Sequence, residues 1–136
     1  MTRNLIAAVL ATALMVPLMA RPAHAQTGPD APAADPRVER QRNGAAKLAG
    51  LVAFVDVFCP EAKGDPQRLR GAVSRLGVDP GELAQGELHL RAKAYTEIYQ
   101  KDVPANCKRA VETFGEGGSA VPGLIVRKER PGLSGR

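Results

Sequence analysis

The dipeptide Asp-Pro recurs along this chain and limits what its middle part can fold into. It occurs three times, at Asp35-Pro36, Asp65-Pro66 and Asp79-Pro80. An Asp side chain accepts hydrogen bonds from the free amides of a helix's first turn, and Pro fits the first helical position, where no donor is needed. Each pair therefore predicts a helix start. At Asp79 the prediction is strengthened by Glu82, which completes the spacing of a capping box.

Helix stops follow these starts at suitable distances. Gly77 and Gly115 each come directly after an apolar residue, where a left-handed glycine would close the helix. Val103-Pro104 offers a fourth, weaker start. We therefore expect the all-α fold class, as a small four-helix domain with helices near 36–59, 66–76, 80–101 and 104–114.

Apolar residues recur at three-and-four spacing in each expected helix, as on one buried helical face. The expected core positions are Leu48, Leu51, Val52, Val55, Phe58 and Cys59; Leu69, Ala72, Val73 and Leu76; Ala84, Leu88, Ala92, Tyr95 and Tyr99, with Ala94 and Ile98 widening the stripe; and Cys107, Ala110, Val111 and Phe114. The run LVAFVDVFC, residues 51–59, would also suit a buried strand because it is rich in Val and Phe. We favour helix for it, because no other segment supplies a convincing strand partner.

The first 25 residues have the three parts of a secretory signal peptide. Arg3 forms a basic start, Leu5–Met19 is an apolar run, and Ala23-His24-Ala25 is a small-x-small cleavage site. A transmembrane anchor is the competing interpretation, but the apolar run falls short of the roughly 20 residues that a bilayer needs. We expect cleavage before Gln26, periplasmic localisation, and no membrane span after cleavage.

Loss of this segment would change the composition of the chain. The mature protein would hold 111 residues (136 − 25), with His89 as its one histidine and without methionine or tryptophan. Its charge would be +3, from 17 Lys and Arg (19 − 2) against 14 Asp and Glu. Both signs are interspersed, which gives little support for nucleic-acid or membrane attraction. We expect a flexible linker over 26–34, the helical domain over 35–115, and a Gly/Pro-rich, partly disordered C-terminal segment over 116–136.

Cys59 and Cys107 are the two cysteines of the chain. Pro60 disfavours helical geometry in the residue before it, so Cys59 should end the first helix, whereas Cys107 falls in the first turn of the fourth. An even cysteine count in an exported protein predicts a disulfide between them. On the chain-entropy model, a loop of this length stabilises the fold by roughly 4 kcal/mol. A redox or haem site would need Cys-x-x-Cys, and a zinc site needs three or four ligands, so we predict no metal and no cofactor.

Three polar or aromatic features each allow two interpretations. His89 is an ordinary helix residue or a sensor of modest acidification. Tyr95 and Tyr99, four residues apart, belong to the core or line a groove, with the core favoured. Asp56 is the edge of a solvated face or a buried carboxylate with a basic partner. None of these features makes a catalytic constellation.

We therefore expect a non-enzyme, namely a small exported binding or adaptor protein that acts through protein–protein interaction. Its partner would be another envelope protein, with no role for nucleic acid. The surfaces expected to meet that partner are the two tyrosines and the C-terminal tail, namely Tyr95, Tyr99, Leu124, Ile125, Val126, Arg127 and Lys128. An enzyme would instead require a pocket that gathers carboxylates such as Glu61, Glu87 or Glu97.

Two alternative functions stay open. The chain is similar in format to the small periplasmic acid-stress chaperones, which are also helical, exported and single-disulfide. This similarity implies a stress-responsive, chaperone-like role, although no shared motif accompanies it. An immunity or inhibitor protein against an exported toxin is also compatible with the sequence.

Overall fold

The computed structural model describes residues 33–129. Its elements are α1 (Pro36–Phe58), β1 (Ala62–Gly64), α2 (Pro66–Arg75), a 3-10 turn (Pro80–Leu83), α3 (Gly86–Tyr99), a second 3-10 turn (Gln100–Asp102), α4 (Val103–Phe114) and β2 (Ile125–Arg127). The predicted signal peptide, most of the predicted linker and residues 130–136 of the predicted C-terminal segment lie outside the described residues. Within the described part, the expectation of a mostly helical fold is confirmed.

Each of the three Asp-Pro pairs begins a helical segment, as predicted. In each, the Asp side chain caps the first turn. The side chains of Asp35, Asp65 and Asp79 each accept a hydrogen bond from the backbone amide two residues later, at 2.8 Å. In each segment the proline takes one of the first two helical positions. The Asp caps and the prolines therefore account for where these elements start.

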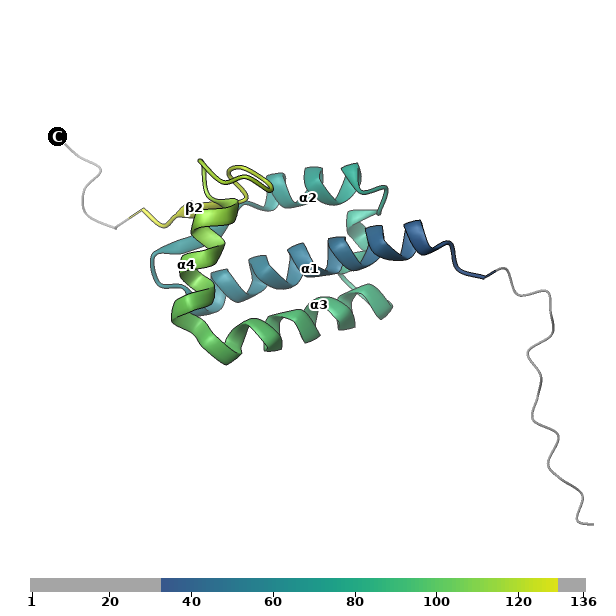
Figure 1. Ribbon diagram of the computed structural model, residues 1–136, viewed down its shortest axis with the longest axis horizontal. Helices are drawn as coiled ribbons and strands as arrows, with labels where there is room; N and C mark the ends of the chain where they lie inside the picture. The colour runs from purple at the N-terminus through teal and green to yellow at the C-terminus, as the bar shows by residue number, and fades with distance from the viewer. Residues whose placement is uncertain (1–32, 130–136) are drawn as a thin grey trace, which may run out of the picture. The chain divides into compact units, whose positions relative to one another are not determined.

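Helix α1 is the central element of the fold. In Figure 1 it lies between α2 and α3, and α4 crosses it near its C-terminal end. Its buried residues are Ala45, Ala46, Gly50, Leu51, Val52, Phe54 and Val55, which spread over more than the single face that was predicted. Phe54 is fully buried and its ring stacks on Phe58 and contacts Tyr99, with ring centroids 5.7 Å apart in both pairs. A helix covered by neighbours on several sides needs apolar residues on several sides, which explains why the Val- and Phe-rich run is helical.

The prediction of one helix over 80–101 is wrong. A 3-10 turn covers Pro80–Leu83, and α3 begins only at Gly86, whose φ of 75° lies in the left-handed region. Glu82 does not complete a capping box; its carboxylate pairs with Arg42 of α1 at 2.5 Å. At the other end, α3 leads through the second 3-10 turn directly into α4, with no loop between them. The division into four separate helices is therefore not confirmed.

Several residues predicted to be buried are exposed. They are Ala84, Ala94, Ile98 and Val111. Ala84 follows the 3-10 turn instead of lying inside a helix, and the other three lie on helix faces that no neighbouring element covers.

Gly115 ends α4 in a different conformation from the one predicted, because its φ of −68° is not left-handed. The glycine is needed there for space, since a Cβ would lie 2.3 Å from the carbonyl oxygen of Val111.

The predicted all-α class is confirmed as a mostly helical fold, to which the structure adds two short strands that pair antiparallel. Lys63 of β1 faces Val126 of β2, and the pairing is extended by a hydrogen bond from the Asp65 amide to the Leu124 carbonyl oxygen at 2.8 Å. Leu124 and Ile125 are fully buried in the same core cluster as Phe54. The folded unit therefore continues past residue 115 and returns the chain to the end of α1.

Candidate functional site

A groove with a mostly apolar lining lies between α1 and α4. On α1 it is lined at positions 44, 47, 48 and 51, and on α4 at positions 106, 109, 110 and 113. Both sets follow the i, i+3, i+4, i+7 spacing of one helical face, so two helical stripes face each other across the groove. The groove encloses about 580 Å³, which lies within the roughly 300–1,000 Å³ of small-molecule sites in proteins. We call it the α1–α4 groove.

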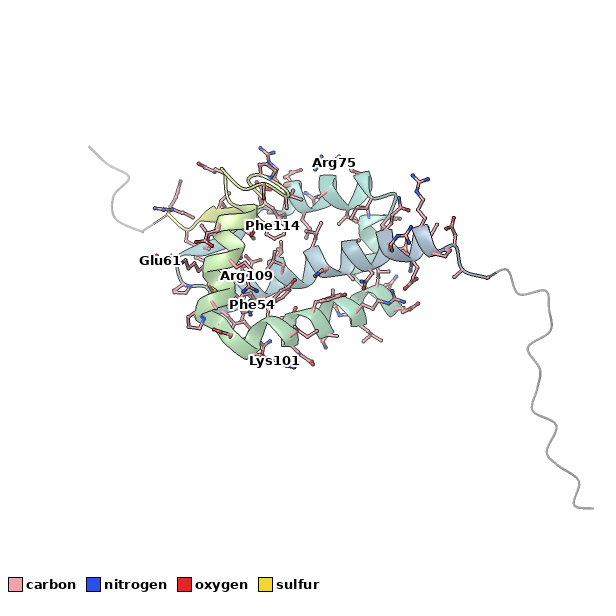
Figure 2. The ribbon with its side chains drawn as sticks, viewed as in Figure 1. Phe54, Glu61, Arg75, Lys101, Arg109 and Phe114 are labelled. Atoms are coloured by element: carbon pink, nitrogen blue, oxygen red, sulfur yellow. A yellow bond between two sulfur atoms is a disulfide. The ribbon has the colours of Figure 1, made fainter. Side chains whose placement is uncertain are left out.

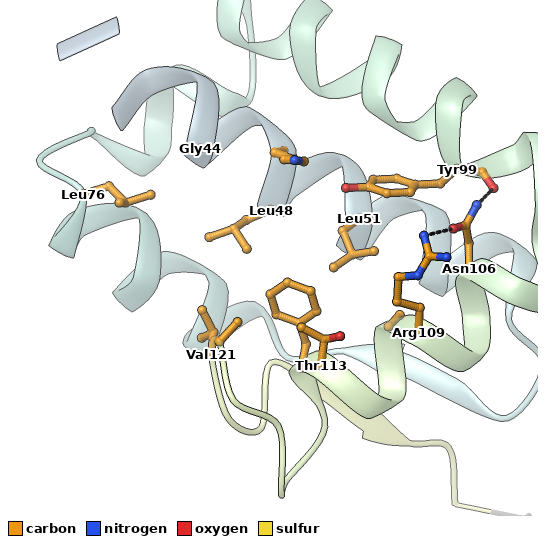
Figure 3. A pocket seen from close by; sticks show the side chains of 13 residues that line it. Gly44, Leu48, Leu51, Leu76, Tyr99, Asn106, Arg109, Thr113 and Val121 are labelled. Atoms are coloured by element: carbon orange, nitrogen blue, oxygen red, sulfur yellow. Dashed lines mark hydrogen bonds between the residues drawn. The ribbon is translucent and has the colours of Figure 1, made fainter. Parts of the chain in front are cut away.

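Other elements close its ends. Leu76, at the C-terminal cap of α2, and Val121, in the loop after α4, lie at one end, and Tyr99 of α3 lies at the other (Figure 3). The complete lining is Gly44, Lys47, Leu48, Leu51, Leu76, Tyr99, Asn106, Arg109, Ala110, Thr113, Phe114, Ala120 and Val121. Most of these residues are apolar or small.

Backbone hydrogen bonds hold the loop that forms one wall. The Ala120 amide donates to the Thr113 carbonyl oxygen at 3.2 Å, and the amides of Gly118 and Gly123 both donate to the Gly115 carbonyl oxygen at 2.9 Å. Because these bonds tie the loop back to the last turn of α4, the wall is built before any ligand arrives.

The ionisable groups of the groove, apart from the Tyr99 phenol, are two cations. Lys47 and Arg109 line it, and the lining contains no carboxylate. Neither forms an ion pair with another residue in the range 33–129, whereas Arg42 and Arg91 of the same unit are paired with glutamates. Figure 2 shows Arg109 projecting from α4, the helix that also carries Phe114. The groove therefore has an apolar surface and a positive charge.

Tyr99 adds a hydroxyl group to this surface. Burial raises the pKa of the Tyr99 phenol above its ordinary value of 10.0, and the nearby Tyr95 raises it further. The phenol is therefore protonated at neutral pH and can donate a hydrogen bond. Of the two interpretations of the tyrosines, Tyr99 fits both, because it packs on Phe54 and also lines the groove.

The predicted disulfide is present. Cys59, at the C-terminal cap of α1, is bonded to Cys107 of α4, with their Cα atoms 5.7 Å apart. The bond joins the two helices that form the long walls of the α1–α4 groove. In sequence, Cys107 directly follows Asn106, the first α4 residue that lines the groove.

The predicted partner surface is not brought together as one patch. Tyr95 lies on the seam between α3 and α1, where its hydroxyl donates to Asn43 Oδ1 at 2.9 Å. The side chains of Leu124 and Ile125 are inside the core, so in the folded protein they cannot contact a partner. Val126 and Arg127 belong to β2, and whether they meet a partner stays a prediction.

Lys128 has a structural contact that the sequence did not indicate. Its Nζ donates to the carbonyl oxygens of Cys59 at 3.0 Å and of Asp56 at 3.4 Å. These are carbonyls at the C-terminal end of α1, where a cation is favourable. The Asp56 carboxylate itself accepts from the Gly64 amide at 2.7 Å, and so contacts the backbone of β1 instead of a basic side chain.

The remaining candidates lie apart from the groove. His89 Nδ1 is 3.0 Å from the Leu83 carbonyl oxygen, and Glu87 pairs with Arg91 within α3. None of Glu61, Glu87 and Glu97 lines the α1–α4 groove. Within residues 33–129, no group of three or more His, Cys, Asp or Glu side chains is placed to hold a metal ion.

Sequence reasoning missed Lys47, Asn106, Arg109 and Thr113. The stripe at 106, 109, 110 and 113 was visible in the sequence, but it lies one residue before the face that was predicted to be buried. The sequence did not show that this stripe faces α1.

Comparisons with known proteins give no further guide. The chain matches no protein-family model, no curated protein and no solved structure. In the part of the chain that the structure describes, no helix has both the length and the apolar character to cross a membrane.

Proposed function

We propose that this protein is a small exported, non-catalytic binding protein whose ligand occupies the α1–α4 groove. The observation that carries the proposal is the groove itself, an apolar site of about 580 Å³ between two helices, with a wall fixed by backbone hydrogen bonds. Sites of this kind, largely preformed and mostly apolar with a few polar groups, are typical of small-molecule binding.

Export is supported by two independent features. The N-terminal sequence has the pattern of a cleavable signal peptide. The Cys59–Cys107 disulfide is a bond that persists in oxidising compartments such as the periplasm. Because this bond joins the walls of the groove, an oxidising environment would also keep the binding site intact.

An adaptor role toward another envelope protein stays a prediction, with the groove instead of the C-terminal tail as the contact surface. A protein partner would have to enter the groove with an apolar segment, because Leu124 and Ile125 are not available to it. The chaperone-like and inhibitor roles stay predictions.

A neutral apolar dye tests the proposal. We expect 1-N-phenylnaphthylamine to become fluorescent when it enters the groove of the mature protein. At Gly44, a Cβ would meet only Leu76 Cδ1, at 3.6 Å, so Gly44→Phe should fill the groove and abolish the signal, while Gly44→Ala, the matched control, should keep it. No dye fluorescence with the native chain, or the same signal with Gly44→Phe, would contradict the proposal.

A further inference from the structure

The α1–α4 groove is polar at one end and apolar at the other. Figure 3 shows Tyr99, Asn106 and Arg109 together at one end, and Leu76 and Val121 at the opposite end, with Leu48 and Leu51 between them. A ligand that fits this arrangement has a polar head and an apolar body. Its head would lie beside Arg109 and its body along the leucines of α1.

The charges that line the groove indicate which charge the polar head of the ligand carries. Lys47 and Arg109 are cations without ion pairs among the described residues, and no carboxylate lines the groove. An anionic head beside Arg109 would therefore meet a positive charge and no carboxylate of the lining, whereas a cationic head would be repelled.

The polar end can also supply hydrogen-bond donors in a fixed arrangement. The Asn106 amide nitrogen donates to the Tyr99 carbonyl oxygen at 2.8 Å, which orients its oxygen toward Arg109, 3.5 Å from a guanidinium nitrogen. The guanidinium has five N–H donors and this contact uses one, so a planar carboxylate can still accept two parallel hydrogen bonds from it. The Tyr99 hydroxyl, which has no hydrogen bond to any residue in 33–129, lies at the end of its ring away from Asn106, so it adds a donor to the middle of the groove and not to the polar end (Figure 3).

We propose that the ligand of the α1–α4 groove is a fatty acid, with its carboxylate on Arg109 and its single acyl chain running toward Leu76 and Val121. This inference rests on the proposed binding function and adds the ligand class. A volume of about 580 Å³ suits one acyl chain. Each methylene that the groove buries should raise the affinity by up to about fourfold.

The test compares dodecanoate with dodecan-1-ol as displacers of 1-N-phenylnaphthylamine from the mature protein. The two molecules have the same chain length and differ in the charge of the head. We expect dodecanoate to bind about tenfold more tightly, because it adds hydrogen bonds to a charged group. In Arg109→Gln this preference should disappear, because loss of the guanidinium should weaken binding of dodecanoate far more than binding of the uncharged dodecan-1-ol.

Arg70→Gln is the matched control, because Arg70 is exposed on α2 and does not line the groove. It should keep the full preference for the acid.

Dye binding without displacement by dodecanoate would overturn the fatty-acid inference and leave the proposed binding function in place, whereas absence of dye binding would contradict both. Equal affinity for acid and alcohol, or a preference that survives Arg109→Gln, would also overturn it. Displacement by an amphipathic helical peptide but not by dodecanoate would assign the groove to a protein partner instead.

Discussion

At the scale of single residues, two glycines of α1 have opposite roles. Gly50 lies where α1 and α3 approach most closely, because a Cβ there would come within 2.5 Å of the Ala92 carbonyl oxygen and 2.6 Å of Tyr95 Cβ. The Thr96 hydroxyl lies 3.1 Å from the carbonyl oxygens of Gly50 and Ala92 at the same crossing. Gly44 lies six residues earlier and borders the open groove. The first glycine is required by packing and the second is not.

The same substitution at these two positions should therefore change stability in opposite directions. Gly50→Ala should lower the free energy of unfolding by about 1–3 kcal/mol, because the backbone of α3 must move to admit the methyl group. Gly44→Ala should raise it by about 0.5–1 kcal/mol, because Ala is the better helix former and its Cβ has room. Urea denaturation of both variants checks this. A Gly50→Ala variant that is as stable as the native chain would show that the close crossing at Gly50 is absent.

At the scale of elements, the disulfide and the β1–β2 pair hold the end of α1 in place. Cys59 follows the last residue of α1 and is bonded to α4, while Lys128 contacts the last carbonyls of the same helix from just after β2. Elements that are distant in sequence thus meet at one end of α1. This end also anchors the walls of the groove.

The Cys59→Ala/Cys107→Ala variant should lose both stability and binding. The residues are 48 apart in sequence, and releasing a loop of that length should cost about 4 kcal/mol on the chain-entropy model. Denaturant unfolding monitored by circular dichroism measures the loss, and dye fluorescence reports the groove. Oxidised and reduced native chain provide the same comparison without mutation. Unchanged dye binding in a fully reduced, folded protein would show that the disulfide does not hold the groove.

Leu124 should contribute to the core as strongly as a residue of a long helix. Its side chain is fully buried although it precedes a strand of three residues. Leu124→Ala should therefore lower the free energy of unfolding by about 2–5 kcal/mol. The control is Leu90→Ala, whose side chain is 65% exposed and whose change should stay within about 0.5 kcal/mol. A small effect at Leu124, similar to that at Leu90, would mean that the returning segment is not part of the core.

At the scale of the whole molecule, the features that could be predicted from the sequence are those set by a few residues, whereas features set by tertiary packing could not be predicted. The Asp-Pro starts were predictable because the aspartate and the amide that it caps are two residues apart. The disulfide was predictable because only one pairing of two cysteines exists. Both outcomes depend on few residues.

Other features depend on neighbours that the sequence does not name. Phe54 lies off the predicted face of α1 and is buried because other elements surround that helix. The segment Ala62–Gly64 has no residue typical of strands and is a strand because residues 125–127 pair with it. The groove likewise arises only when the stripe of α4 is placed against α1. Tertiary packing sets all three, so local patterns could not reveal them.

The central claim is that the α1–α4 groove is the binding site of this protein. Backbone amide chemical shifts of the ¹⁵N-labelled mature protein, recorded while dodecanoate is added, test it most directly. We predict that the largest changes cluster on residues that line the groove, with Leu48 and Leu51 on α1 and Arg109 and Thr113 on α4 among them. Changes centred on β2, or no saturable changes at all, would contradict the claim.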